Sequence, residues 1–184
     1  MEDLEPGEEL VAAFARWAAQ ERARSAATDR ARQRSLGEQA LSTATWTGIL
    51  VDLAERGAGV TLSVGGHRCT GWIVGVGRDF CVVEQAGRRR PALIPLAPIS
   101  YVSADQPGRA IPTGDRPAGM ELSMAAALAA LAEERVPVAL RAGAEQVEGK
   151  VIGVGEDVVT LRADAPAGRL VHVPLAAVTF CEVR

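Results

Sequence analysis

The chain has few of the residues from which catalytic and metal sites are built. Its 184 residues include only two histidines and three cysteines, and aromatic residues make up 4%. Cys69, Cys81 and Cys181 lack the paired spacing of metal ligands. His67 and His172 fall at different places in the repeat described below, so they do not form a symmetric metal site. We therefore expect no enzyme activity, no metal and no cofactor, and we expect three buried thiols.

Long apolar runs and an excess of basic residues are also missing. No apolar run reaches the roughly 18 residues that a membrane-spanning helix needs, and no basic region precedes an apolar core at the N-terminus. We expect a soluble, cytoplasmic protein with no membrane contact. The net charge is −3 and the pI about 5.5, whereas a domain that binds phosphate backbones usually has a basic face. The charge balance favours a protein partner over a nucleic acid.

The sequence does contain a long internal repeat. Residues 60–83 correspond to residues 138–161 at a separation of 78, and eight of these positions are identical. Ordinary residue usage predicts about two identities by chance. The segment 94–99 corresponds to 173–178 at a separation of 79, so one copy has an extra loop residue. The match predicts duplication of a whole structural unit.

The hydrophobic period changes once within each copy. Apolar residues recur every three or four positions around 46–53, which predicts a helix, and then alternate from Val60 onward, which predicts strands. Each copy is therefore expected to be a helix followed by about five short strands, curled into a small bent barrel. Turn and bend roles are expected for a set of residues shared by the two copies: Gly65, Gly71, Asp79, Gly143, Gly149 and Asp157.

The fold class is thus mainly β with helices, in four segments. Residues 1–35 are predicted to form a long amphipathic, arginine-rich helix, whose clearest pattern covers 8–34. Residues 36–103 and 119–184 are the two helix-plus-barrel units. Residues 104–118 mix proline with glycine and are predicted to be a linker.

The first copy contains Val60-x-Leu62-x-Val64-Gly65-Gly66, then Gly71, then Asp79 in a turn, and the closing segment 94–99. With this pattern the repeated unit resembles the Sm-like (LSm/Hfq-like) superfamily of small β-barrels. It implies two tandem Sm-like barrels with open strand edges. Because Sm-like proteins typically pair such edges between subunits, it also implies a homo-oligomer, either a dimer or a ring of three chains. Pro95-Leu96-Ala97 stands where the Hfq type has its basic Tyr-Lys-His stretch.

Two groups of arginines are candidate contacts for RNA or an acidic partner. A guanidinium can make two hydrogen bonds to a phosphate or a carboxylate, and a solvated surface is the alternative for both groups. The first group lies on the predicted N-terminal helix and the second lies between two predicted strands of the first unit. Their members are Arg22, Arg24, Arg30, Arg32 and Arg34, and Arg88, Arg89 and Arg90.

Two functions from different classes follow. The first is a non-catalytic scaffold or adaptor that self-associates or binds a partner protein through its strand edges. The second is an RNA-binding protein of the Sm-like kind. Net charge favours the first, and only the resemblance in fold favours the second.

Overall fold

The computed structural model describes residues 42–88, 90–105, 119–165 and 168–184, and isolated residues between 20 and 39. Met1–Thr43 separates from Ala44–Arg184, which is one compact unit, and the description below concerns the latter. The helix predicted over 8–34 lies largely outside the described residues, and so does most of the linker predicted over 104–118.

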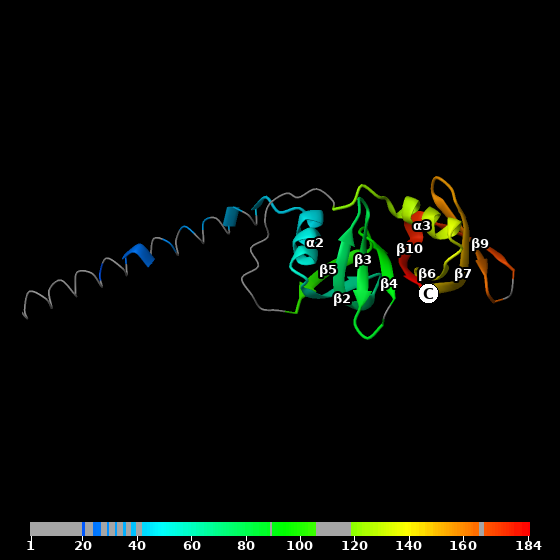
Figure 1. Ribbon diagram of the computed structural model, residues 1–184, viewed down its shortest axis with the longest axis horizontal. Coiled ribbons are helices and arrows are strands. Elements are labelled where there is room, and N and C mark those ends of the chain that lie inside the picture. Colours follow the sequence, from blue (N-terminus) through cyan, green and yellow to red (C-terminus); the bar gives the residue numbers. More distant parts are fainter. Residues whose placement is uncertain are drawn as a thin grey trace, which may run out of the picture. The chain divides into compact units, whose positions relative to one another are not determined.

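Two copies of one element order make up this part of the chain (Figure 1). The first copy contains α2 (Trp46–Glu55), β1 (Gly59–Val64), β2 (His67–Val76), β3 (Phe80–Gln85), β4 (Pro91–Pro95) and β5 (Ile99–Ala104). The second contains α3 (Met124–Glu133), β6 (Pro137–Ala142), β7 (Glu145–Val154), β8 (Val158–Ala163), β9 (Leu170–Pro174), a 3₁₀ turn (Leu175–Ala177) and β10 (Val178–Val183). The duplication and the helix-plus-five-strand unit are both confirmed.

The equivalence extends to the start of each helix and to strand register. Thr45 accepts a hydrogen bond from the Gly48 N–H at 3.1 Å and so caps α2, and Ser123 accepts one from Ala126 at 3.2 Å and so caps α3. β2 and β3 shift register between Ile73 and Gly75, and β7 and β8 shift at the equivalent place. Equivalent positions are 78 residues apart up to β3 and β8, and 79 apart from β4 and β9 onward.

All ten strands belong to one antiparallel sheet in the order β5-β1-β2-β3-β4-β10-β6-β7-β8-β9. The predicted helix and five strands of each unit are present, but the sheet is not closed into a barrel as the prediction of two small bent barrels required. The last strand of each unit does pair with its first, as β5 does with β1 and β10 does with β6. However, the free side of β4 pairs with β10 of the other unit. Neither five-stranded unit closes on itself, and the two units continue into each other.

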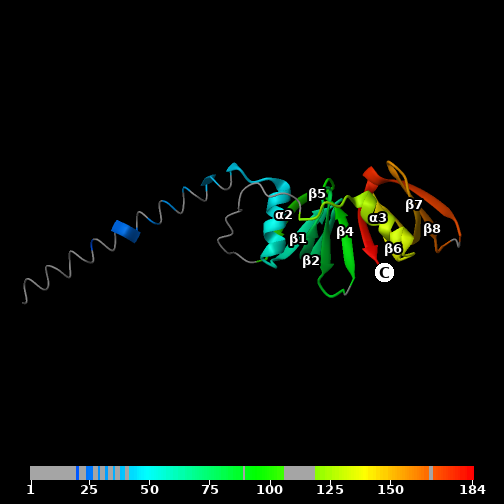
Figure 2. The ribbon, with the colours of Figure 1, turned by 45° about the horizontal axis from the view of Figure 1, so that its top comes forward.

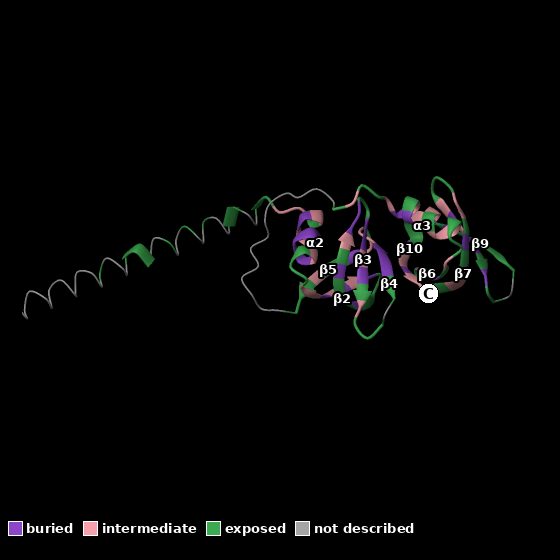
Figure 3. Ribbon diagram, in the orientation of Figure 1, coloured by how far each residue is buried: buried purple, intermediate pink, exposed green. Residues whose placement is uncertain are grey.

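Two apolar cores lie within this sheet, one for each unit (Figure 3). In the first core, Leu50 from α2 packs with the inward-facing β1 residues Val60 and Leu62, all 0% exposed. In the second, Leu128 from α3 packs with the equivalent Val138 and Leu140, also 0% exposed. Each helix therefore covers the strands of its own unit with its apolar face.

Gly71 and Gly149 occupy equivalent places where two strands approach closely. A Cβ on Gly71 would lie 2.1 Å from the Glu84 carbonyl oxygen, and one on Gly149 would lie 2.1 Å from that of Arg162. No heavy atom can occupy that space, so only glycine fits. The sequence indicated a bend at these positions, and the structure shows that the requirement is steric.

The three cysteines are buried and unpaired, as predicted. Burial raises the pKa of Cys81 and of Cys181 to about 12. A neutral thiol in an apolar core behaves as a small hydrophobic residue, so these cysteines serve packing.

We expect Gly149→Ala to lower the free energy of unfolding by about 2 kcal/mol or more, because the new methyl group overpacks the β7–β8 contact. Gly153→Ala is the matched control in the same strand, since no atom lies within 4 Å of its added Cβ. It should change stability by less than about 1 kcal/mol. Urea denaturation followed by circular dichroism measures both, and equal losses would contradict the steric role of Gly149.

The buried thiols predict a loss of stability at alkaline pH. The unfolded chain loses its thiol protons above the ordinary pKa of 9.0, whereas folded Cys81 and Cys181 keep theirs up to about 12. Unfolding therefore releases protons, and the free energy of unfolding should fall by up to about 1.4 kcal/mol per pH unit for each thiol above pH 9. Urea denaturation at about pH 8 and pH 10.5 tests this. The Cys81→Ala/Cys181→Ala variant should show a shallower decline, and an unchanged decline would refute the assignment.

Candidate functional site at the junction of the two units

The two units are joined by antiparallel pairing of β4 with β10 (Figure 2). Cys181 lies opposite Leu93, and Glu182 lies opposite Ala92. Two apolar side chains of the first unit, Phe80 and Leu93, belong to the core cluster of the second unit. The junction therefore combines backbone hydrogen bonding with continuous apolar packing.

A second contact ties α3 to the β2–β3 turn of the first unit. The Met124 N–H, in the first turn of α3, donates to Oδ1 of Asp79 at 2.7 Å. Arg78 pairs with Glu121 at 2.8 Å, and its backbone N–H donates to the Leu122 carbonyl at 2.9 Å. An acidic side chain beside a helix N-terminus accepts a hydrogen bond from a free backbone N–H, and its negative charge interacts favourably with the helix dipole. The start of α3 is thus held by a residue of the other unit.

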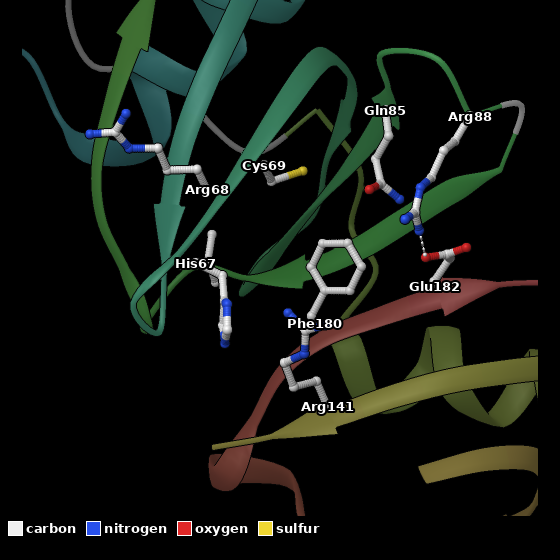
Figure 4. Close-up of a pocket in the computed structure, with 9 residues that line it drawn as sticks. His67, Arg68, Cys69, Gln85, Arg88, Arg141, Phe180 and Glu182 are labelled. Atoms are coloured by element: carbon white, nitrogen blue, oxygen red, sulfur yellow. Dashed lines mark hydrogen bonds and ion pairs between the residues drawn. The ribbon is translucent and has the colours of Figure 1, made fainter. Parts of the chain in front are cut away.

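A cavity of about 240 Å³ lies at this junction (Figure 4). β1, β2 and β3 with its following loop line one side, and β6 and β10 line the other. The lining residues are Val64, His67, Arg68, Cys69, Gln85, Arg88, Arg141, Phe180 and Glu182. The Gln85 amide and the Arg88 side chain point toward the Phe180 ring, whereas Arg68 points away from this group.

Some polar groups of this cavity have hydrogen-bond partners, and one buried group has none in the described part of the chain. Nη1 of Arg88 donates to a Glu182 carboxylate oxygen at 2.9 Å. Nη2 of Arg141 donates to Gln146 at 3.1 Å, and its guanidinium lies 5.9 Å from the centre of the Phe180 ring. Nε2 of Gln85 is buried and has no hydrogen-bond partner among the described residues. The cavity wall therefore holds an amide donor that lacks an acceptor.

Cys69 lies at the edge of the same cavity and is buried. Burial raises the pKa of its thiol, the positive charge of Arg88 opposes this effect, and the negative charge of Glu182 adds to it. Its sulfur is therefore a protonated, weakly polar part of the cavity wall at neutral pH.

A second cavity of about 530 Å³ occupies the equivalent place in the second unit. Ala142, Glu145, Gln146, Val147 and Ala163 line it, and they are equivalent to Val64, His67, Arg68, Cys69 and Gln85 of the first cavity. The first cavity is bounded on one side by β10, which pairs with β4. No described strand pairs with the outer side of β9, so the second cavity lacks the equivalent wall. Its charged lining is also mainly acidic, with Glu145, Glu148 and Asp164 beside Arg169.

The sheet ends in two free edges. Among the described strands, β5 pairs only with β1, and β9 pairs only with β8. Tyr101 on β5 is 43% exposed, and Leu170 on β9 is 49% exposed. β5 is equivalent to β10, and β9 is equivalent to β4. The two ends of the sheet are therefore the counterparts of the two strands that pair at the junction.

The arginines predicted as contacts are not brought together as one surface. Arg88 and Arg90 are exposed beside the junction, and Arg88 is paired as described above. Arg24 and Arg32 are exposed in the N-terminal segment Met1–Thr43, outside the two helix-plus-five-strand units. Four of the predicted contacts lie outside the described residues: Arg22, Arg30, Arg34 and Arg89.

The predicted turn residues lie at turns or at close strand contacts. Gly65 and Gly143 have φ values of 53° and 59°, in the β1–β2 and β6–β7 turns. Asp79 bonds to α3, and its equivalent Asp157 is exposed, with its backbone carbonyl accepting from the Leu175 N–H. Sequence reasoning missed Gln85, Arg141 and Phe180 as a group. The one available signal was the equivalence of Phe180 with Tyr101, which places an aromatic ring at one strand position in both units.

The described residues contain no cluster of three or more potential metal-ligating side chains. No helix among them is both long and apolar enough to span a bilayer. No model of a known protein family matches the chain, and no curated protein matches it.

We expect Asp79→Ala to lower the free energy of unfolding by about 1 kcal/mol, because the N–H of Met124 loses its acceptor. Asp157→Ala is the matched control, since Asp157 is the equivalent exposed residue and its side chain bonds to no described helix. It should change stability by less than about 0.5 kcal/mol. Urea denaturation measures both values, and equal losses would show that the contact with α3 contributes nothing.

Proposed function

We propose that this protein is a non-catalytic scaffold that assembles head to tail with further copies of itself. The observation that supports this is the equivalence of its free edges with its internal junction. β4 pairs with β10 within the chain, and their equivalents, β9 and β5, have no partner on their outer sides among the described strands. A free edge offers a row of backbone donors and acceptors to another strand. β9 of one copy could therefore pair with β5 of the next in the way that β4 pairs with β10 within one chain.

The internal junction predicts the register between copies. Leu93 is equivalent to His172, and Cys181 is equivalent to Val102. Since Leu93 lies opposite Cys181, His172 of one copy is expected opposite Val102 of the next. Leu93 is 8% exposed at the junction, whereas His172 is exposed. The edge of β9 is thus more polar than that of β4, its counterpart in the first unit. Polar edge residues limit pairing with strands of unrelated proteins.

The second cavity supports the same partner. At the junction, β10 places Phe180 against the first cavity. In a head-to-tail pair, β5 of the next copy would place Tyr101 at the equivalent position over the second cavity. Tyr101, which is exposed at the β5 edge, would then be covered. Its burial would add an apolar anchor to the backbone hydrogen bonds of the contact.

The Sm-like resemblance of each unit supports closure of this assembly. Head-to-tail contacts produce a ring when the rotation closes and a filament when it does not. Two or three chains would supply four or six helix-plus-five-strand units. We favour such a closed ring, which leaves no free strand edge and presents both faces of the sheet to a partner protein.

The assembly is tested with two variants, each blocked at one edge. Tyr101→Asp places a charge at the β5 edge, and His172→Asp places one at the position equivalent to buried Leu93. Both residues are exposed, so each variant should fold. Light scattering at tens of micromolar should give a mass of two or three chains for the parent protein and of one chain for each variant.

Mixing the two variants distinguishes a head-to-tail contact from a symmetric one. A 1:1 mixture retains one intact β9 and one intact β5, so it should form a heterodimer and nothing larger. His172→Leu, which copies Leu93, should strengthen assembly relative to the parent. A parent protein that is monomeric at these concentrations, or a mixture that stays monomeric while the parent assembles, would refute the proposal.

A further inference from the structure

The cavity between the units has the composition of an anion site. Three arginines and one histidine line it against a single glutamate, in a chain whose net charge is −3. Glu182 pairs with Arg88, and Arg141 has no carboxylate partner among the described residues. The cavity therefore retains positive charge after its internal ion pair is formed.

The buried amide of Gln85 indicates that the cavity needs an acceptor. Nε2 of Gln85 is the one buried side-chain nitrogen or oxygen among the described residues without a hydrogen-bond partner. Leaving such a donor unsatisfied costs about as much as a lost hydrogen bond. An acceptor oxygen in the cavity would satisfy it, and Figure 4 shows the amide directed toward the space beside Phe180.

We propose that this cavity binds a small phosphate monoester with an apolar substituent. The donors come from two sides of the cavity, with Gln85 at the end of β3, Arg88 in the loop that follows it and Arg141 on β6. Phosphate offers more acceptor oxygens than a carboxylate, so it can meet donors on several sides. Val64, Cys69 and the Phe180 ring supply the apolar wall for the substituent. The volume of about 240 Å³ lies below the usual range for drug-sized ligands, which fits a small molecule.

This site is independent of assembly, since one chain supplies all its lining residues. The equivalent cavity does not share the chemistry. Ala163 replaces Gln85, and Glu145 replaces His67, so it has neither the buried amide donor nor the positive charge. Arg169 of that second cavity is exposed, and it offers a control of equal charge.

Calorimetric titration of the full chain with phenyl phosphate and with inorganic phosphate tests the proposal. Phenyl phosphate should bind with a dissociation constant of about 1 mM or lower, and more tightly than inorganic phosphate because its ring contacts Phe180. Arg141→Gln and Gln85→Leu should each weaken binding about tenfold or more. Arg169→Gln, which changes the net charge equally, should leave binding unchanged.

Further measurements separate the site from packing and from nucleic acid. Without ligand, the melting temperature of Gln85→Leu should be unchanged or higher, because the variant removes an unsatisfied buried donor. A lower melting temperature would show that the amide already has a partner and would overturn the proposal. The proposal would also be overturned if phenyl phosphate did not bind at 10 mM, which is about tenfold above the expected dissociation constant. It would likewise be overturned if Arg141→Gln and Arg169→Gln weakened binding equally. A short single-stranded RNA that binds more tightly, in a manner lost in Arg141→Gln, would assign the cavity to a phosphodiester instead.

Discussion

The pairing of β4 with β10 is the contact on which the rest of this arrangement depends. It converts two five-stranded sheets into one and brings Arg141, Phe180 and Glu182 against β2 and β3. Its register covers only two residue pairs, and a backbone hydrogen bond contributes a net of about 1 kcal/mol. Burial of a side chain as large as Phe80 or Leu93 contributes about 1.5–3 kcal/mol. Apolar packing across the junction therefore outweighs the strand pairing, which mainly sets direction and register.

Much of the fold could be predicted from sequence because the relevant signals are local. Helical spacing around 46–53 and alternation from Val60 specify one helix followed by strands, and their repetition specifies the second unit. Barrel closure could not be predicted in the same way. Whether β4 pairs with another strand of its own unit or with β10 depends on a contact between segments far apart in the sequence. The alternation of apolar residues is the same in either case, so it does not distinguish them.

The junction cavity was harder to predict than the fold for a related reason. Arg88 stands out in a run of three arginines, but its partner Glu182 lies 94 residues away. Phe180 packs partly buried against the first core and lines the cavity wall, and nothing in the sequence places it beside Gln85 or Arg141. Gln85 carries no sequence signal, because an amide at a strand end is ordinary. Its significance comes from the lack of an acceptor, which depends on every neighbouring group.

Covalent duplication allowed the two cavities to diverge. In an assembly of identical single units, every contact between neighbours has the same side chains, and a substitution appears in all of them at once. Here His67 and Arg68 belong to the lining of one cavity, and Glu145 and Gln146 occupy the equivalent places in the other. A chain with two units can thus keep a basic cavity beside an acidic one. Successive copies arranged in line would present the two charges alternately, with a period of one whole chain rather than one unit.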